Sequence, residues 1–286
     1  MPYALSGEVK LYYEEVGTGS PIVFVHEFGA DHREWLPQVQ YLSREYRCIR
    51  FSARGYLPSD VPETAEQYGH IRSADDVIAV MDATGVGRAH VVGLSMGGYA
   101  ALQVGIRYPD RVSSLVVAAA GSGSVREQQA DFSKGARAQA DRFVAEGSAA
   151  VAQEIGHSTT RIQLKIKDPL GWQTFMSHLA EHSPEGSAHT LRNYQAARPS
   201  VFDFEAEFAA CVAPTLLIVG DEDDACLEPN IFLKRTMANA QLLVVPGTGH
   251  AVNLEEPAVF NDAVYRFLSR VERGLQLRDP RTRPAR

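Results

Sequence analysis

The sequence predicts an α/β fold, a mostly parallel doubly wound sheet with an inserted helical cap. Short β-branched apolar runs alternate with segments of helical spacing along most of the 286 residues. This alternation is typical of a parallel sheet covered by helices on both faces. One apolar run ends in a glycine-rich turn around Ser95 that opens a helix. Between residues 122 and 204 the strand patterns stop, and several helices separated by Pro and Gly are expected instead.

The elements of the core follow one another in a regular order. Strands are expected at residues 9–15, 22–25, 46–51, 89–93, 112–120, 213–220 and 241–245. Amphipathic helices are expected around residues 35–42 and 74–81, after the turn at Ser95, and from residue 257 onward. Because active sites of parallel sheets lie at the carboxyl ends of the strands, we expect the functional residues in the loops that follow them.

The predicted organisation is one core interrupted by one insertion. Residues 1–121 and 205–272 form the core, and residues 122–204 form the helical cap. The end of the chain, residues 273–286, is rich in Arg and Pro and is expected to be disordered. A cap over the sheet edge would wall off the active site and shape the substrate pocket.

Composition excludes several classes of protein. The formal net charge is −7, which gives no electrostatic reason to expect nucleic acid as a partner. The three cysteines, Cys48, Cys211 and Cys226, are widely spaced, which indicates a reducing compartment and neither a disulfide framework nor a metal cluster. No secretion signal and no bilayer-spanning run is recognisable, so we expect a cytoplasmic protein without a membrane partner. A homodimer stays open.

The turn at Ser95 carries the main functional signal. It reads Gly93-Leu94-Ser95-Met96-Gly97-Gly98 and lies between a strand and a small-residue helix. In so sharp a turn the serine backbone is strained and its hydroxyl is exposed, and only small neighbours leave room for it. The alternative is a glycine-rich turn that merely packs a helix against the sheet.

A histidine and an acid follow in the order that a serine nucleophile requires. His250 lies in a loop of small residues after the last predicted strand. A serine hydroxyl needs an imidazole to take its proton and a carboxylate to orient that imidazole. The acid is expected in the loop after the strand at 213–220, where Asp221, Asp223 and Asp224 compete.

Together these segments resemble the α/β-hydrolase fold family. The segment from His250 to Pro257 is similar to that of serine esterases and 3-oxoadipate enol-lactonase-like enzymes. The resemblance implies Ser95 as nucleophile, His250 as base and Asp223 as the orienting acid. It also implies an oxyanion hole formed by the backbone N–H groups of Phe28 and Met96.

Two departures from the family pattern affect the expected function. Glu27 stands where the family has glycine, and we expect its side chain to turn away from the developing oxyanion or to recognise substrate. Carbon–carbon bond hydrolases of ring-cleavage products typically have Asn before the serine and Trp after the histidine. Here Leu94 and Ala251 occupy those positions, which disfavours that activity.

The sequence therefore predicts a cofactor-independent, metal-free serine hydrolase of a small carboxylic ester or lactone. The alternatives are a carbon–carbon bond hydrolase and a ligand receptor on the same fold. Substrate recognition is expected in the cap, where the aromatic candidates are Trp172 and Phe175, with packing inside the cap as the alternative. The arginines that could bind a substrate carboxylate or face water are Arg126, Arg137, Arg161 and Arg192.

Overall fold

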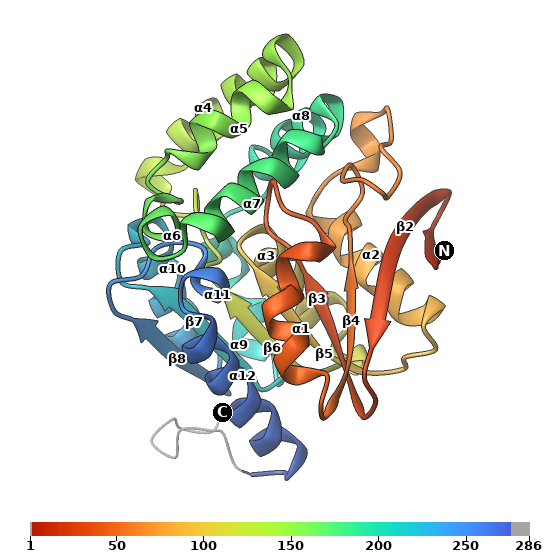
Figure 1. Cartoon of the computed structure of the whole chain (residues 1–286). Coiled ribbons are helices and arrows are strands. Elements are labelled where there is room, and N and C mark those ends of the chain that lie inside the picture. The colour runs from red at the N-terminus through yellow and green to blue at the C-terminus, as the bar shows by residue number, and fades with distance from the viewer. Residues whose placement is uncertain (1, 276–286) are drawn as a thin grey trace.

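The computed structural model describes residues 2–275, and these form a layered α/β structure around one sheet (Figure 1). The eight strands lie in the order β1-β2-β4-β3-β5-β6-β7-β8. Their bounds are β1 (Tyr3–Ser6), β2 (Val9–Val16), β3 (Ser20–Val25), β4 (Tyr46–Phe51), β5 (Ala89–Leu94), β6 (Val112–Ala118), β7 (Thr215–Gly220) and β8 (Ala240–Val245). The pairs β1–β2 and β2–β4 are antiparallel, and every pair from β4 to β8 is parallel. The predicted fold class is confirmed.

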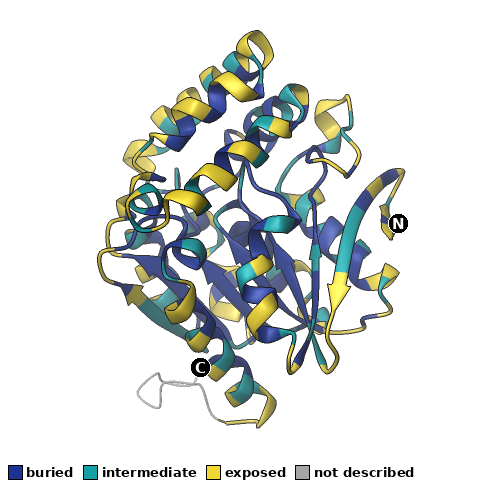
Figure 2. Ribbon diagram, in the orientation of Figure 1, coloured by how far each residue is buried: buried dark blue, intermediate teal, exposed yellow. Residues whose placement is uncertain are grey.

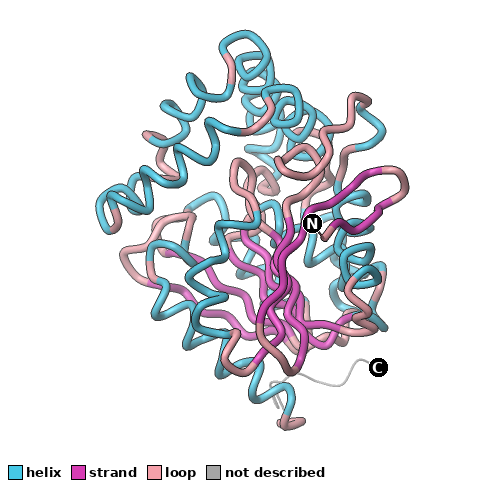
Figure 3. Tube along the Cα trace, turned by 45° about the vertical axis from the view of Figure 1, so that its right-hand side comes forward, coloured by secondary structure: helices cyan, strands magenta, loops and turns pink. Residues whose placement is uncertain are grey.

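Helices cover both faces of the sheet (Figure 3). On one face, α2 (His70–Ala83) and α3 (Met96–Arg107) bury Val77 and Tyr99 in a cluster that Phe208 and Leu233 extend. The latter two residues come from α9 (Glu205–Ala210) and α10 (Asp224–Thr236). On the other face, α1 (Leu36–Leu42) and α12 (Pro257–Glu272) pack around Trp35 and Phe260. The short helix α11 (Val252–Glu255) precedes α12.

The central strands explain why their sequences read as continuous apolar runs. All six residues of β5 and all six of β7 are buried. Figure 2 shows these strands in dark blue inside the molecule, whereas exposed residues lie on the outer surfaces of the helices, in loops and at the end of β2. A strand between two helical layers has no solvent face, so apolar residues occupy both sides of the pleat. The short edge strand β1 was not predicted, because its four residues show no clear alternation.

A group of helices separates β6 from β7 in the sequence and lies together above the sheet (Figure 1). Their bounds are α4 (Arg126–Glu146), α5 (Ser148–Gly156), α6 (Ile162–Lys167), α7 (Pro169–Glu181) and α8 (Pro184–Thr190). They bury an apolar cluster of their own around Phe143, Val151 and Leu179, which Phe28 of the core joins. These helices correspond to the predicted cap, and we keep 122–204 as its proposed limits.

The ends of the described chain limit two further predictions. Helix α12 ends at Glu272, and residues 276–286 of the predicted tail lie outside the described residues. Among residues 2–275, no helix combines the length and the apolar character needed to cross a lipid bilayer.

Candidate active site

Ser95 lies at a strained turn between β5 and α3. Its backbone angles are φ 53° and ψ −111°, and its N–H donates to the Ala118 carbonyl of β6 at 2.7 Å. A positive φ is energetically unfavourable for a residue that has a side chain, so the surrounding contacts must hold Ser95 in this conformation. Helix α3 begins so close to β3 that a Cβ on Gly97 would lie 2.0 Å from the Val25 carbonyl oxygen. Glycine is therefore required at residue 97 for the turn to form.

The structure brings the predicted histidine and one of the three predicted acids to Ser95. His250 Nε2 lies 2.8 Å from Ser95 Oγ, and His250 Nδ1 lies 2.8 Å from Asp223 Oδ2. Asp223 follows β7 and His250 follows β8, so both come from carboxyl ends of parallel strands, as Ser95 does. Asp221 instead accepts a hydrogen bond from the Thr248 N–H, at 3.2 Å. Asp224 is exposed at the start of α10.

The surroundings of His250 and Asp223 shift the pKa values of both side chains. Burial by itself would lower the pKa of His250, but the charge and hydrogen bond of Asp223 outweigh it and raise that pKa well above its ordinary value. Burial would raise the pKa of Asp223, yet the neighbouring imidazole lowers it. With Nδ1–H donated to Asp223, Nε2 is left to accept the proton of the Ser95 hydroxyl.

The two predicted oxyanion donors lie in the loop after β3, which holds Phe28, and at the start of α3, which begins with Met96. The N–H of Glu27 donates to Glu34, and the N–H groups of Gly29 and Ala30 donate to Tyr56 and to the Glu27 carbonyl. The Phe28 N–H finds no acceptor among residues 2–275. Met96 is the first residue of α3, so its N–H has no acceptor within the helix. These two N–H groups are free to bind an oxyanion.

His26 holds that loop in place through two hydrogen bonds. Its Nδ1 donates to the Glu27 carbonyl at 2.7 Å, and its Nε2 accepts from the Ala53 N–H at 2.9 Å. Burial lowers the pKa of His26 to about 4, so the imidazole stays neutral in this arrangement.

The Glu27 carboxylate does not turn away from the site of the developing oxyanion, so the first of its two expected orientations is wrong. Glu27 Oε2 lies 3.8 Å from His250 Nε2 and 2.6 Å from Arg161 Nη2. The Glu27 and Arg161 side chains are 2% and 3% exposed, so this is a buried ion pair that joins the core to the cap. Arg161 thereby neutralises a carboxylate that would otherwise oppose negative charge on the substrate.

A second buried carboxyl, Glu34, stands behind Glu27. Burial and the neighbouring charge of Glu27 raise the pKa of Glu34 well above its ordinary value, and Glu34 Oε2 accepts a hydrogen bond from the Glu27 N–H at 3.1 Å. The raised pKa favours the neutral form of Glu34. The charge of Arg161 is therefore balanced by one carboxylate, that of Glu27.

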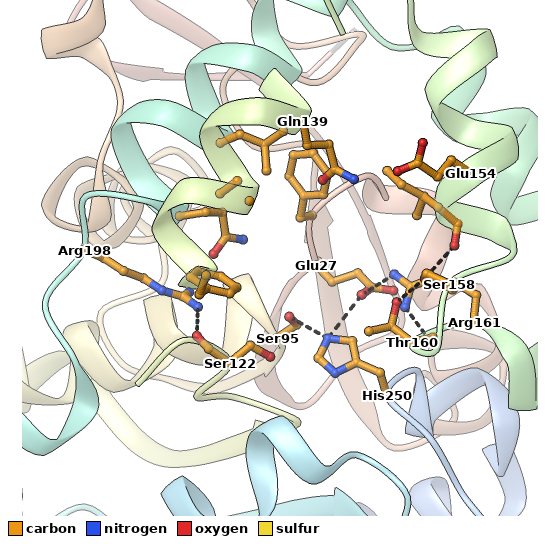
Figure 4. Close-up of a pocket in the computed structure, with 17 residues that line it drawn as sticks. Glu27, Ser95, Ser122, Gln139, Glu154, Ser158, Thr160, Arg161, Arg198 and His250 are labelled. Atoms are coloured by element: carbon orange, nitrogen blue, oxygen red, sulfur yellow. Dashed lines mark hydrogen bonds and ion pairs between the residues drawn. The ribbon is translucent and has the colours of Figure 1, made fainter. Parts of the chain in front are cut away.

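The site opens into a cavity of about 420 Å³ between core and cap (Figure 4). The core contributes Glu27, Phe28, Ser95 and His250, and the segment from residue 122 to residue 198 contributes Ser122, Phe132, Ile155, Arg161, Leu191, Gln195 and Arg198, among others. A volume of this size suits a small substrate.

The predicted aromatic substrate contacts are not on this wall. Trp172 donates its Nε1–H to the Gly156 carbonyl at 2.6 Å, and Phe175 packs beneath the Arg161 guanidinium at 4.3 Å. Both rings pack within the cap, since helix α7 turns that face toward α5 and α6. Of the four predicted arginines, Arg161 reaches the cavity. Arg198, which the sequence did not single out, lines it as well.

One group of side chains could be considered as a metal site. Among residues 2–275, the potential ligand atoms of Asp223, Cys226 and His250 lie within 4.8 Å of one another. Metal ions bind the thiolate form of cysteine, and burial raises the pKa of the Cys226 thiol. Asp223 and His250 already satisfy each other, so the arrangement favours a hydrogen-bonded relay over a metal centre.

Comparison with known proteins assigns the family. Residues 20–257 match the model of the alpha/beta hydrolase fold family. The chain belongs to this family. The resemblance predicted from the Ser95 and His250 segments is thus confirmed.

Relatives of this alpha/beta hydrolase act on different substrates. The 3-oxoadipate enol-lactonase 1 of Acinetobacter baylyi is 29% identical over 255 residues, 88% of this chain and 89% of the relative. The putative non-heme bromoperoxidase BpoC of Mycobacterium tuberculosis is 29% identical over 275 residues, 92% and 99% of the two chains. A malate-bound thermophilic esterase from Thermogutta terrifontis has a TM-score of 0.80 and 29% identity, covering 93% of this chain and 95% of that one. Enol-lactonases and esterases are thus among its relatives.

Proposed function

We propose that this protein is a serine hydrolase that cleaves a small carboxylic ester or lactone through an acyl-enzyme. The observation that carries the proposal is the continuous relay Asp223–His250–Ser95, with both hydrogen bonds at 2.8 Å, at the floor of a cavity of about 420 Å³. The enol-lactonase and esterase relatives support the same bond type.

The proposed reaction begins with attack of Ser95 Oγ on the substrate carbonyl. His250 Nε2 takes the hydroxyl proton, and Asp223 stabilises the resulting imidazolium. The free N–H groups of Phe28 and Met96 bind the oxyanion of the tetrahedral intermediate. His250 then donates the proton to the leaving alcohol oxygen, which departs and leaves the acyl group on Ser95.

Water completes the cycle by the same route. His250 takes one proton from water as its oxygen attacks the acyl carbonyl, and the second tetrahedral intermediate collapses by expelling Ser95 Oγ. The serine recovers its proton from His250, and a carboxylic acid is released. No cofactor or metal takes part in these steps.

The decisive test replaces the nucleophile. Ser95→Ala should abolish turnover of p-nitrophenyl acetate, while circular dichroism shows an unchanged fold. Ser114→Ala is a matched control, because Ser114 Oγ also lies 2.7 Å from a histidine nitrogen, His90 Nδ1, but belongs to the opposite end of the sheet. This control should keep its turnover. Full activity in Ser95→Ala would reject the proposal.

The same assay separates the alternative functions. A ligand receptor on this fold would bind esters or lactones without meaningful turnover by the wild-type protein. A carbon–carbon bond hydrolase would turn over ring-cleavage diketones in preference to short esters and lactones.

A further inference from the structure

Two arginines line the cavity, and they differ in whether a carboxylate balances their charge. Arg161 is paired with Glu27 at 2.6 Å, and Glu34 adds no charge to that pair. Arg198 has no carboxylate within 4.0 Å of its guanidinium among residues 2–275. Glu154, the other acidic residue on the wall, is paired with Arg142, which also pairs with Glu146. Of the two arginines on the wall, Arg198 is therefore the one without a carboxylate partner in the described part of the chain.

Arg198 is buried in a way that leaves part of its hydrogen-bonding capacity unused. The residue is 9% exposed, and its guanidinium carbon lies 4.7 Å from the centre of the Tyr99 ring. Nη2 donates to the Ser122 carbonyl at 2.9 Å, whereas Nη1 is buried without a partner. Stacking on Tyr99 and the bond to Ser122 hold the guanidinium in one orientation.

Burying an unpaired cation is energetically costly. A buried, well-oriented arginine without a carboxylate partner therefore indicates that a bound anion completes the site. A planar guanidinium matches a carboxylate, which it can bind through two N–H groups. A single guanidinium without a carboxylate partner balances the charge of a monoanion, whereas a dianionic phosphate ester would keep one unbalanced negative charge. The carboxylate is thus the better match to this wall.

The position of Arg198 relative to the nucleophile fits a substrate group. Figure 4 shows the Arg198 side chain reaching Ser122 on one side of Ser95, while His250, Glu27 and Arg161 lie on the other side. An anionic substrate group is attracted toward Arg198, because the charge of Arg161 across the cavity is already balanced by Glu27. The anionic group is thereby held on the Arg198 side of Ser95, with the substrate carbonyl at the nucleophile.

We propose that Arg198 binds a carboxylate of the substrate, so that the protein prefers esters or lactones that carry a carboxylate group. This inference rests on the proposed function and adds the class of substrate to it. Arg198 acts in binding and orientation and takes no part in bond making or breaking.

Matched substrates test the preference in the wild-type protein. One pair places the charge in the acyl part, the p-nitrophenyl monoester of glutaric acid against p-nitrophenyl pentanoate. The other pair places it in the leaving group, 4-acetoxybenzoate against 4-acetoxybenzamide. We expect kcat/KM to favour the anionic member of at least one pair by roughly 10- to 100-fold, the range of a charge-assisted hydrogen-bonded contact.

Variants connect that preference to Arg198. Arg198→Met should lower the ratio of anionic to neutral kcat/KM by the same factor, and Arg198→Lys should recover part of it. Arg137→Met is the control, because Arg137 is exposed on α4 and does not line the cavity. A merely structural role of Arg198 would lower turnover of both members equally and leave their ratio unchanged.

Binding without turnover separates failure of this inference from failure of the proposed function. Calorimetry should show tighter binding of hexanoate than of the isosteric neutral hexanamide, and Arg198→Met should remove the difference. If esters are not hydrolysed but hexanoate is preferred, the proposed function fails and the carboxylate site stands. Equal binding of the two probes and equal kcat/KM within both substrate pairs would overturn the inference, whether or not Arg198→Met folds.

Discussion

The ion pair between Arg161 and Glu27 allows a quantitative prediction. Its two atoms lie 2.6 Å apart, and both side chains are almost fully buried. At an effective dielectric constant of about 20, two unit charges at that separation attract by roughly 6 kcal/mol. Arg161→Met removes the cation and leaves the Glu27 carboxylate buried against the cap.

We expect Arg161→Met to lower the free energy of unfolding by about 3–5 kcal/mol at neutral pH, the usual cost of breaking a buried pair on one side. This is a large part of the roughly 5–15 kcal/mol by which a folded protein is stable.

Urea unfolding measures the effect, with an exposed ion pair as control. Arg192 and Asp141 are separated by 2.5 Å but their side chains are 35% and 73% exposed, so Arg192→Met should cost at most about 1 kcal/mol. The double variant Arg161→Met with Glu27→Gln should recover much of the loss. Equal losses in the two single arginine variants, or simple additivity in the double variant, would refute the reasoning.

Three further predictions concern the relay and the loops around it. Activity needs neutral His250, whose pKa is raised by Asp223, so kcat/KM should rise with pH through a value above 6.5. Asp223→Asn should move this rise to lower pH and reduce the maximal kcat/KM by about 10³- to 10⁴-fold, as a pH–rate profile would show. Gly97→Ala should lower both the unfolding midpoint in urea and kcat, because its Cβ would displace the Val25 carbonyl, and wild-type values would contradict the packing argument. Burial and the charge of Glu27 raise the pKa of Glu34, so the stability that Glu34 contributes is present below its unfolded pKa and is lost as pH rises through the raised folded value. In urea titrations Glu34→Gln should therefore gain stability relative to wild type as the pH rises above the unfolded pKa of about 4.3, and a parallel pH dependence would argue against a neutral Glu34.

The sequence by itself determined the sheet and the nucleophile turn. Buried parallel strands must be apolar on both faces, so runs such as β5 and β7 are visible without any structure. The serine at residue 95 is constrained by its positive φ and Gly97 by close contact with the Val25 backbone, and the glycine-rich turn makes both visible in the sequence. The chain order of Ser95 and His250 then predicts that they meet, because carboxyl ends of parallel strands share one edge.

Tertiary structure alone decided which side chains face the cavity. Asp221, Asp223 and Asp224 are adjacent in sequence, and only the course of the chain after β7 directs Asp223 toward His250. Glu27 and Arg161 are far apart in sequence, so no local sequence pattern predicts that a cap arginine neutralises the carboxylate in the loop after β3. Trp172 and Arg198 lie on cap segments of ordinary helical or loop composition, and their orientation follows from how those segments pack. Local patterns report backbone geometry and burial, whereas charge pairing and cavity lining depend on contacts between distant segments.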